Sequence, residues 1–162
     1  MRALAFCAPL LLAGGLLLAG CGGSSAQPKD DPGAFAVKVV GQIVHHRYET
    51  AWDDLSSVDQ KVAPSAEYVQ CERRSPVLTA PLTTKVVGIG SESVGLGDGS
   101  FVQSKAVRVR LGFRGGFTLV HTVHVVAEHG KWTWILPSYR FRDYRADKCP
   151  VDAGSTPPAS TS

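Results

Sequence analysis

The sequence predicts an α+β domain in which N-terminal helices pack on a strongly curved, four-stranded antiparallel sheet. Two observations support this fold class. Between residues 32 and 74, apolar side chains recur at intervals of three and four, which is typical of amphipathic helices. From residue 82 onward, Val, Thr, Ile and Phe dominate and glycine-containing turns divide the chain, which is typical of antiparallel strands. Helices therefore come first and strands follow, which indicates two layers.

The first helix has a recognisable start. Asp31 can accept amide hydrogen bonds as an N-cap, and Pro32 suits the first helical position because its missing N–H has no partner there. Apolar side chains then share one face of a single long amphipathic helix: Val37, Val40, Val44, Tyr48, Ala51 and Leu55.

Two shorter helices are expected next. Ser57-Val58-Asp59-Gln60 resembles a capping box, and Pro64 should halt the helix that it opens. Ser65 can cap another helix, which carries Tyr68, Val69 and Cys71.

The strands are expected at 82–94, 101–113, 117–129 and 131–136, with turns at Gly97-Asp98-Gly99, Gly115-Gly116 and His129-Gly130. Alternation places the apolar residues of the second strand on one face: Val107, Val109, Leu111 and Phe113. The more apolar face of the third strand carries Phe117, Leu119, His121, Val123, Val125 and Ala127. Bends or bulges at Gly88, Gly90 and Gly112 would let so long a sheet curl around a helix.

Residues 1–20 have the features of an export signal. Arg2 precedes an apolar stretch too short to span a bilayer, which needs about 20 apolar residues. The stretch ends in Leu18-Ala19-Gly20-Cys21, which resembles the lipobox of bacterial lipoproteins. The resemblance implies cleavage before Cys21, lipid on its thiol, and attachment to the extracytoplasmic face of the cell membrane. The alternative is an ordinary secretory signal with a chance cysteine.

The remaining chain divides into a tether, a domain and a tail. Residues 21–33 begin with a Gly- and Ser-rich run that predicts a flexible lipidated tether. Residues 34–149 have the size of one domain, and 150–162 are rich in Ser, Thr and Pro, which predicts a disordered tail. Of the four cysteines, Cys71 and Cys149 remain after cleavage and lipidation. We expect them to form a disulfide, since exported proteins fold in an oxidising compartment.

The charge pattern argues against nucleic-acid binding. The net charge is +3, and removal of the signal lowers it to +2, whereas nucleic-acid binding calls for a clustered basic stripe. Arg140, Arg142, Arg145 and Lys148 do gather near the C-terminus, with Asp143 and Asp147 interleaved. We expect a solvated, self-paired face there, with weak attraction to anionic lipid headgroups as the alternative.

The order of elements, with a few aromatic and cysteine landmarks, resembles the nuclear-transport-factor-2-like superfamily. The landmarks are Ala51-Trp52-Asp53-Asp54-Leu55, Tyr68-Val69-Gln70-Cys71, Lys131-Trp132-Thr133-Trp134-Ile135-Leu136, Tyr144 and Cys149. The resemblance implies a cone of curved sheet closed by an N-terminal helix, as in small exported lipoproteins of high-GC Gram-positive bacteria. It also allows homodimers through the outer sheet face, but the fold hosts enzymes and binding domains alike.

Two residues are candidates for proton transfer inside such a cone. Enzymes of the superfamily, such as ketosteroid isomerases and scytalone-type dehydratases, place Asp, His or Tyr there. Tyr48 on the buried helix face and His121 on the apolar strand face could both point inward. The simpler interpretation, which we favour, is that both are hydrogen-bonded core or rim residues, because no inward carboxylate accompanies them in the strands.

Trp132 and Trp134 share a strand face, where they either pack in the core, which we favour, or line a pocket. A metal site is not expected, since His121 and His124 face opposite sides of a strand. No motif indicates a cofactor. The sequence thus predicts a non-catalytic, membrane-anchored module that binds a small apolar ligand or an envelope protein. The alternative is a small isomerase- or dehydratase-like enzyme that uses His121 and Tyr48.

Overall fold

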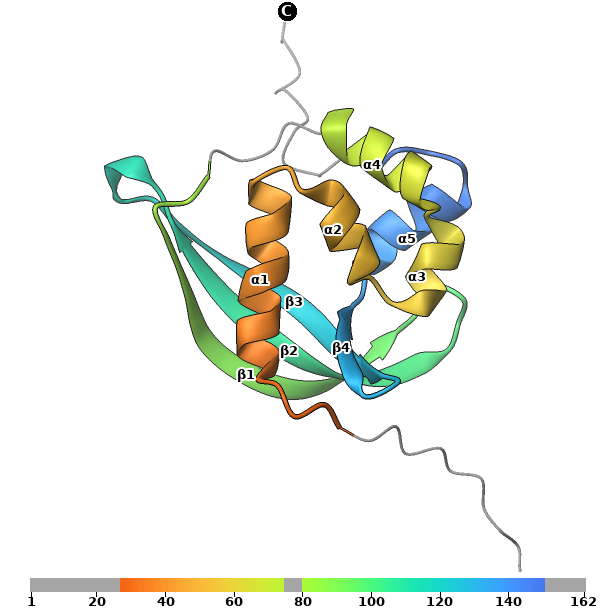
Figure 1. Cartoon of the computed structure of the whole chain (residues 1–162), viewed down its shortest axis with the longest axis horizontal. Helices are drawn as coiled ribbons and strands as arrows, with labels where there is room; N and C mark the ends of the chain where they lie inside the picture. The colour runs from red at the N-terminus through yellow and green to blue at the C-terminus, as the bar shows by residue number, and fades with distance from the viewer. Residues whose placement is uncertain (1–26, 75–79, 151–162) are drawn as a thin grey trace, which may run out of the picture.

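The computed structural model describes residues 27–74 and 80–150, which form helices packed on one antiparallel sheet (Figure 1). The elements in order are α1 (Pro32–Val44), α2 (Tyr48–Asp53), α3 (Ser57–Val62), α4 (Ser65–Arg74), β1 (Thr83–Gly95), β2 (Phe101–Gly112), the 3₁₀ turn η1 (Arg114–Gly116), β3 (Thr118–Glu128), β4 (Lys131–Trp134) and α5 (Ser138–Arg145). The predicted α+β class is confirmed. The export signal, Cys21 and residues 151–162 lie outside the described residues.

The sheet is an antiparallel meander with the order β1-β2-β3-β4. All the predicted strands are confirmed to within two residues. A register shift between Val86 and Gly88 places a bulge in β1 near one of the predicted bends, and this adds to the curvature. The β3–β4 turn has positive φ at both His129 (51°) and Gly130 (77°), the conformation of a tight two-residue hairpin.

The helix α1 lies across the concave side of the sheet, and α2 to α5 gather at one end (Figure 1). The main core forms between α1 and the facing side chains of β2 and β3, among them Val107, Val109 and Val125, which are fully buried. The sheet is open, because β1 and β4 form its two edges. In the described residues, no helix is long and apolar enough to cross a membrane.

The single long helix predicted from Pro32 to Leu55 is wrong, because the chain breaks it after Val44. His46 adopts a left-handed conformation (φ 58°) and donates its backbone N–H to the carbonyl of Ile43, while Arg47 donates to that of Gln42 at 2.8 Å. This pair of hydrogen bonds is a Schellman motif, which terminates a helix. Glycine usually occupies the left-handed position of this motif, but here the residue is His46. The apolar spacing also continues past it, so the sequence pattern does not indicate the break. The apolar face survives the break, since Val40, Tyr48, Ala51 and Leu55 are all buried.

The N-terminus of α1 agrees with the sequence. Asp31 caps the helix by accepting from the backbone N–H groups of Gly33 and Ala34. The folded part reaches back into the range 21–33 that we assigned to the tether, because the carbonyl of Asp30 accepts a hydrogen bond from the Trp132 indole at 2.7 Å. The domain therefore begins a few residues before Ala34.

The cap of α3 is Ser56 rather than the expected Ser57. The Ser56 hydroxyl donates to the Asp59 carboxylate at 2.8 Å and accepts from the Asp59 backbone N–H. The same carboxylate oxygen accepts from the backbone N–H of Leu136 at 3.0 Å, so it joins α3 to the segment that follows β4. Burial raises the pKa of Asp59 to about 6, against the opposing effect of these hydrogen bonds.

Asp59 should give the folding equilibrium a distinct pH dependence. Its pKa in the folded protein, about 6, lies above its ordinary value of 3.8, so the folded state holds the proton more tightly. The free energy of unfolding should therefore fall by about 2 kcal/mol as the pH rises from about 4 to about 6. Urea titrations across this range should show that decline, and Asp59→Asn should flatten it. An unchanged slope in Asp59→Asn would contradict the assignment.

Candidate functional site

The site forms because β4 is much shorter than β3. β4 pairs only with residues 125–128 of β3, and after Ile135 donates to the carbonyl of His124 the chain leaves the sheet for α5. The first half of β3 therefore has no strand partner on this side among the described residues. A pocket of about 740 Å³ opens there, between α1, β3 and the start of α5.

The wall of the pocket is mainly apolar. Its apolar side chains come from α1, from β3, from the ends of β1, β2 and β4, and from the segment between β4 and α5: Val39, Val40, Ile43, Val44, Val94, Leu111, Leu119, Val123, Trp134, Ile135, Leu136 and Pro137. Its polar and ionisable side chains are His121, Thr122, His124, Ser138, Tyr139, Glu72 and Arg140. The volume and the apolar character match those of small-molecule sites, which span about 300–1,000 Å³.

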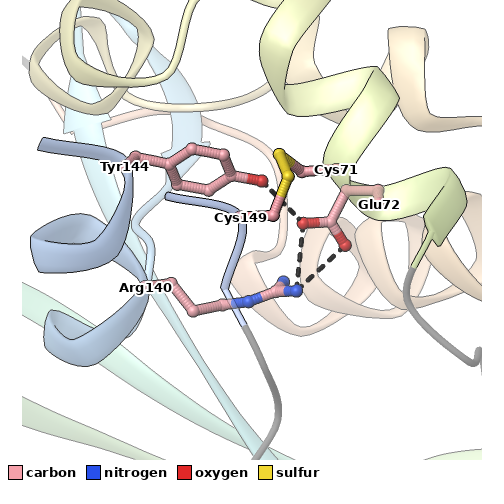
Figure 2. The surroundings of a disulfide bond; sticks show 5 residues. All are labelled: Cys71, Glu72, Arg140, Tyr144 and Cys149. Carbon is pink, nitrogen blue, oxygen red and sulfur yellow. Dashed lines mark hydrogen bonds and ion pairs between the residues drawn. A yellow bond between two sulfur atoms is a disulfide. The ribbon is translucent and has the colours of Figure 1, made fainter. Parts of the chain in front are cut away.

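An ion pair between Glu72 of α4 and Arg140 of α5 forms part of this wall (Figure 2). The Nη2 atom of Arg140 lies 3.0 Å from Oε1 and 3.1 Å from Oε2 of Glu72, and the Tyr144 hydroxyl donates to Oε1 at 3.0 Å. The two side chains are only 4% and 10% exposed. The pair is therefore largely removed from water, where breaking it costs much more than breaking a surface pair.

The disulfide between Cys71 and Cys149 is confirmed and lies beside this ion pair (Figure 2). Its Cα atoms are 5.1 Å apart, and it ties α4 to the chain that follows α5. The bridge therefore joins the C-terminal segment to the helical half of the domain. The ion pair and the Tyr144 hydrogen bond link α4 to α5, and the disulfide links α4 to the chain just after α5.

The predicted solvated face is wrong for Arg140, although Arg142, Arg145 and Lys148 are exposed as expected. Residues 138–145 form a helix, α5, which the sequence pattern did not predict. Arg140 is buried and pairs with Glu72 rather than with Asp143 or Asp147. The sequence does contain one indication of this helix, because Arg140 and Tyr144 are four residues apart and would share one face of a helix. The Phe141 ring also packs so closely on Gly97 that a side chain there would collide with it.

Glu72 is a buried carboxylate on a helix, whereas the predicted strands carry no inward-facing carboxylate. It lies four residues after the buried Tyr68, so the two residues share one face of α4. Burial, followed by the charge of Glu72, raises the pKa values of Tyr48, Tyr68 and Tyr144 above their ordinary value of 10.0. All three hydroxyls therefore carry their protons at neutral pH and can act as hydrogen-bond donors.

Two of these tyrosines form a matched pair for mutation. The Tyr144 hydroxyl donates to Glu72, whereas that of Tyr68 is buried without a hydrogen-bond partner. Tyr144→Phe should lower the free energy of unfolding by about 1.5–3 kcal/mol, because it removes a hydrogen bond to a charged group. Tyr68→Phe should leave it unchanged or raise it by up to about 1 kcal/mol. Urea unfolding of both variants measures the difference, and equal losses would refute this reading of the cluster.

The structure does not bring the two predicted proton-transfer residues together at the pocket. Tyr48 is fully buried, and its hydroxyl lies 3.0 Å from the Nδ1 atom of His46. It is not among the residues that line the pocket. His121 does line the pocket and is exposed.

The two tryptophans are buried, as expected for core residues. Trp134 donates its indole N–H to the carbonyl of Ala51 at 2.8 Å and also contributes to the pocket wall, which Trp132 does not. Packing and pocket lining are therefore combined in Trp134. Within residues 27–74 and 80–150, no cluster of three His, Cys, Asp or Glu side chains could hold a metal ion.

No protein-family model, curated protein or solved structure matches the chain. The geometry of the described residues therefore carries the functional proposals.

Proposed function

We propose that this protein is a lipid-anchored, extracytoplasmic module that binds a small apolar ligand without catalysing a reaction. The observation that carries the proposal is the pocket of about 740 Å³ with its mainly apolar wall. A pocket of this size and character is the usual setting for an apolar ligand, with a few polar groups that fix its orientation. The separation of Tyr48 from the pocket argues against the isomerase- or dehydratase-like alternative.

The proposal of a nuclear-transport-factor-2-like domain is supported by the arrangement of the elements. An N-terminal helix lies across the concave side of a curved antiparallel meander, and the pocket lies between that helix and the sheet. The residues that first suggested the resemblance, such as Trp134 and Cys149, take part in the core and the disulfide.

The membrane attachment rests on the sequence around Cys21. Lipid on this cysteine, with the Gly- and Ser-rich residues after it, would hold the domain close to a membrane surface. That location suits a module whose ligand is apolar and partitions into lipid. Mass spectrometry of the N-terminal peptide should show a lipid-modified Cys21, and an unmodified N-terminus or an intact leader would contradict the anchor.

Ligand binding can be tested with Nile red, an uncharged dye whose fluorescence rises in apolar sites. The protein would be residues 21–162 with Cys21→Ser, which is free of lipid and retains the whole described domain. We expect saturable binding, and we expect Val123→Phe, which fills part of the pocket, to weaken it at least ten-fold.

Val120→Phe is the matched control, because Val120 lies on the same strand, is 48% exposed and does not line the pocket. It should bind the dye like the parent protein. Absence of saturable binding, or equal binding by both variants with unchanged unfolding midpoints, would refute the proposed function.

A further inference from the structure

We infer that the pocket selects ligands with an uncharged polar head, such as a hydroxyl, over ligands of equal chain length with a carboxylate or an ammonium group. This inference rests on the proposed function and deepens it, since it names the chemical class of the ligand. It follows from the arrangement of charge in the pocket wall.

The charged side chains of the wall cancel one another. Among the described residues that line the pocket, Glu72 is the only acidic residue and Arg140 is the only Lys or Arg. The two form an ion pair with each other. The Glu72 carboxylate also accepts from Tyr144. A charged ligand head therefore meets no uncompensated opposite charge in the wall.

Two histidines, His121 and His124, also line the pocket. The Nδ1 atom of His124 lies 3.1 Å from the Ser104 hydroxyl. Its Nε2 atom lies 4.0 Å from the carboxylate of Glu92, which is largely exposed. His121 lies on β3 at the exposed side of the pocket. The binding measurements are therefore set at about pH 8, above the range in which imidazoles ordinarily titrate.

The cost of desolvation then decides which head binds. A carboxylate or an ammonium group that enters the pocket loses water and gains no counter-charge, which is strongly unfavourable. A hydroxyl loses much less hydration, and uncharged polar residues such as Ser138 are among those that line the pocket. The apolar part of the ligand contributes equally in all three cases, so the head alone sets the preference.

Displacement of Nile red by decanol, decanoate and decylamine at about pH 8 tests the inference on the protein with residues 21–162 and Cys21→Ser. The three compounds share one alkyl chain and differ in head charge. Decanol should displace the dye at concentrations at least ten-fold lower than either ion. If Nile red binds but decanoate or decylamine competes as well as decanol, the inference fails while the proposed function stands. If Nile red does not bind, the proposed function itself fails.

Two variants connect the preference to the ion pair. Glu72→Gln leaves Arg140 without its counter-charge and should shift the preference towards decanoate by at least ten-fold relative to decanol. The double variant Glu72→Gln/Arg140→Met removes both charges and should again favour decanol, which guards against a loss of selectivity through misfolding. An unchanged preference in folded Glu72→Gln would show that the pair does not govern selection and would overturn the inference.

Discussion

Arg140→Met is expected to lower the free energy of unfolding by about 3–5 kcal/mol, a large part of the stability of a small domain. The variant keeps the long aliphatic stem of the side chain but leaves the Glu72 carboxylate buried without a counter-charge. That carboxylate is only 4% exposed, so water compensates poorly for the lost guanidinium. Urea unfolding followed by tryptophan fluorescence measures the loss, since Trp132 and Trp134 are buried in the core.

An exposed pair of the same chemistry provides a matched control. Arg73 of α4 lies 2.7 Å from Glu49 of α2, closer than the atoms of the buried pair, but the two side chains are 63% and 57% exposed. Arg73→Met should therefore cost less than about 1 kcal/mol. If the two variants lost equal stability, burial would not be the deciding factor and the account of the Glu72–Arg140 pair would be wrong.

The double variant Glu72→Gln/Arg140→Met separates the cost of an unpaired charge from the loss of packing. The glutamine side chain that replaces Glu72 would still offer a carbonyl oxygen to the Tyr144 hydroxyl, and no buried charge would remain. Replacement of both partners of a buried pair by neutral residues is often nearly neutral. We expect the double variant to regain most of the stability that Arg140→Met loses. A double variant as unstable as the single one would mean that shape, and not charge, holds α5 in place.

The sheet could be predicted from the sequence because its determinants are local. Alternating apolar residues such as Val107 and Val109 identify the face of β2, and the pair His129-Gly130 identifies a tight turn. The start of α1 is equally local, since Asp31 and Pro32 act on adjacent backbone groups. The disulfide was predicted by a different route, because the proposed cleavage before Cys21 and lipidation of Cys21 would leave only Cys71 and Cys149.

The missed features depend on contacts between distant segments. α5 is strongly polar, and its place in the domain is set by Glu72, which lies 68 residues earlier than Arg140. The helix break depends on His46 in a left-handed conformation that non-glycine residues seldom adopt. The pocket depends on how early β4 ends, and just after that end the Leu136 N–H donates to Asp59, which lies 77 residues earlier in the chain. Periodicity along the chain carries none of this information.

Removal of the Cys71–Cys149 disulfide is expected to lower the free energy of unfolding by up to about 4.5 kcal/mol. The bridge closes a loop between residues that are 78 positions apart, so it restricts the unfolded chain considerably. Cys71→Ala/Cys149→Ala removes it by mutation, and dithiothreitol removes it from the unaltered sequence. Agreement between the two unfolding midpoints would show that the loss comes from the cross-link and not from the truncated side chains.

A double-mutant cycle can show whether the disulfide also acts on the folded protein. If the bridge only restricts the unfolded chain, its effect and that of Arg140→Met should add to within about 0.5 kcal/mol. We expect a larger coupling, because the bridge and the Glu72–Arg140 pair hold the same contact between α4 and α5 and Glu72 is the neighbour of Cys71. Coupling above about 1 kcal/mol in urea titrations would therefore indicate that the disulfide positions Glu72. Strict additivity would contradict that role and leave the bridge as a restraint on the unfolded chain alone.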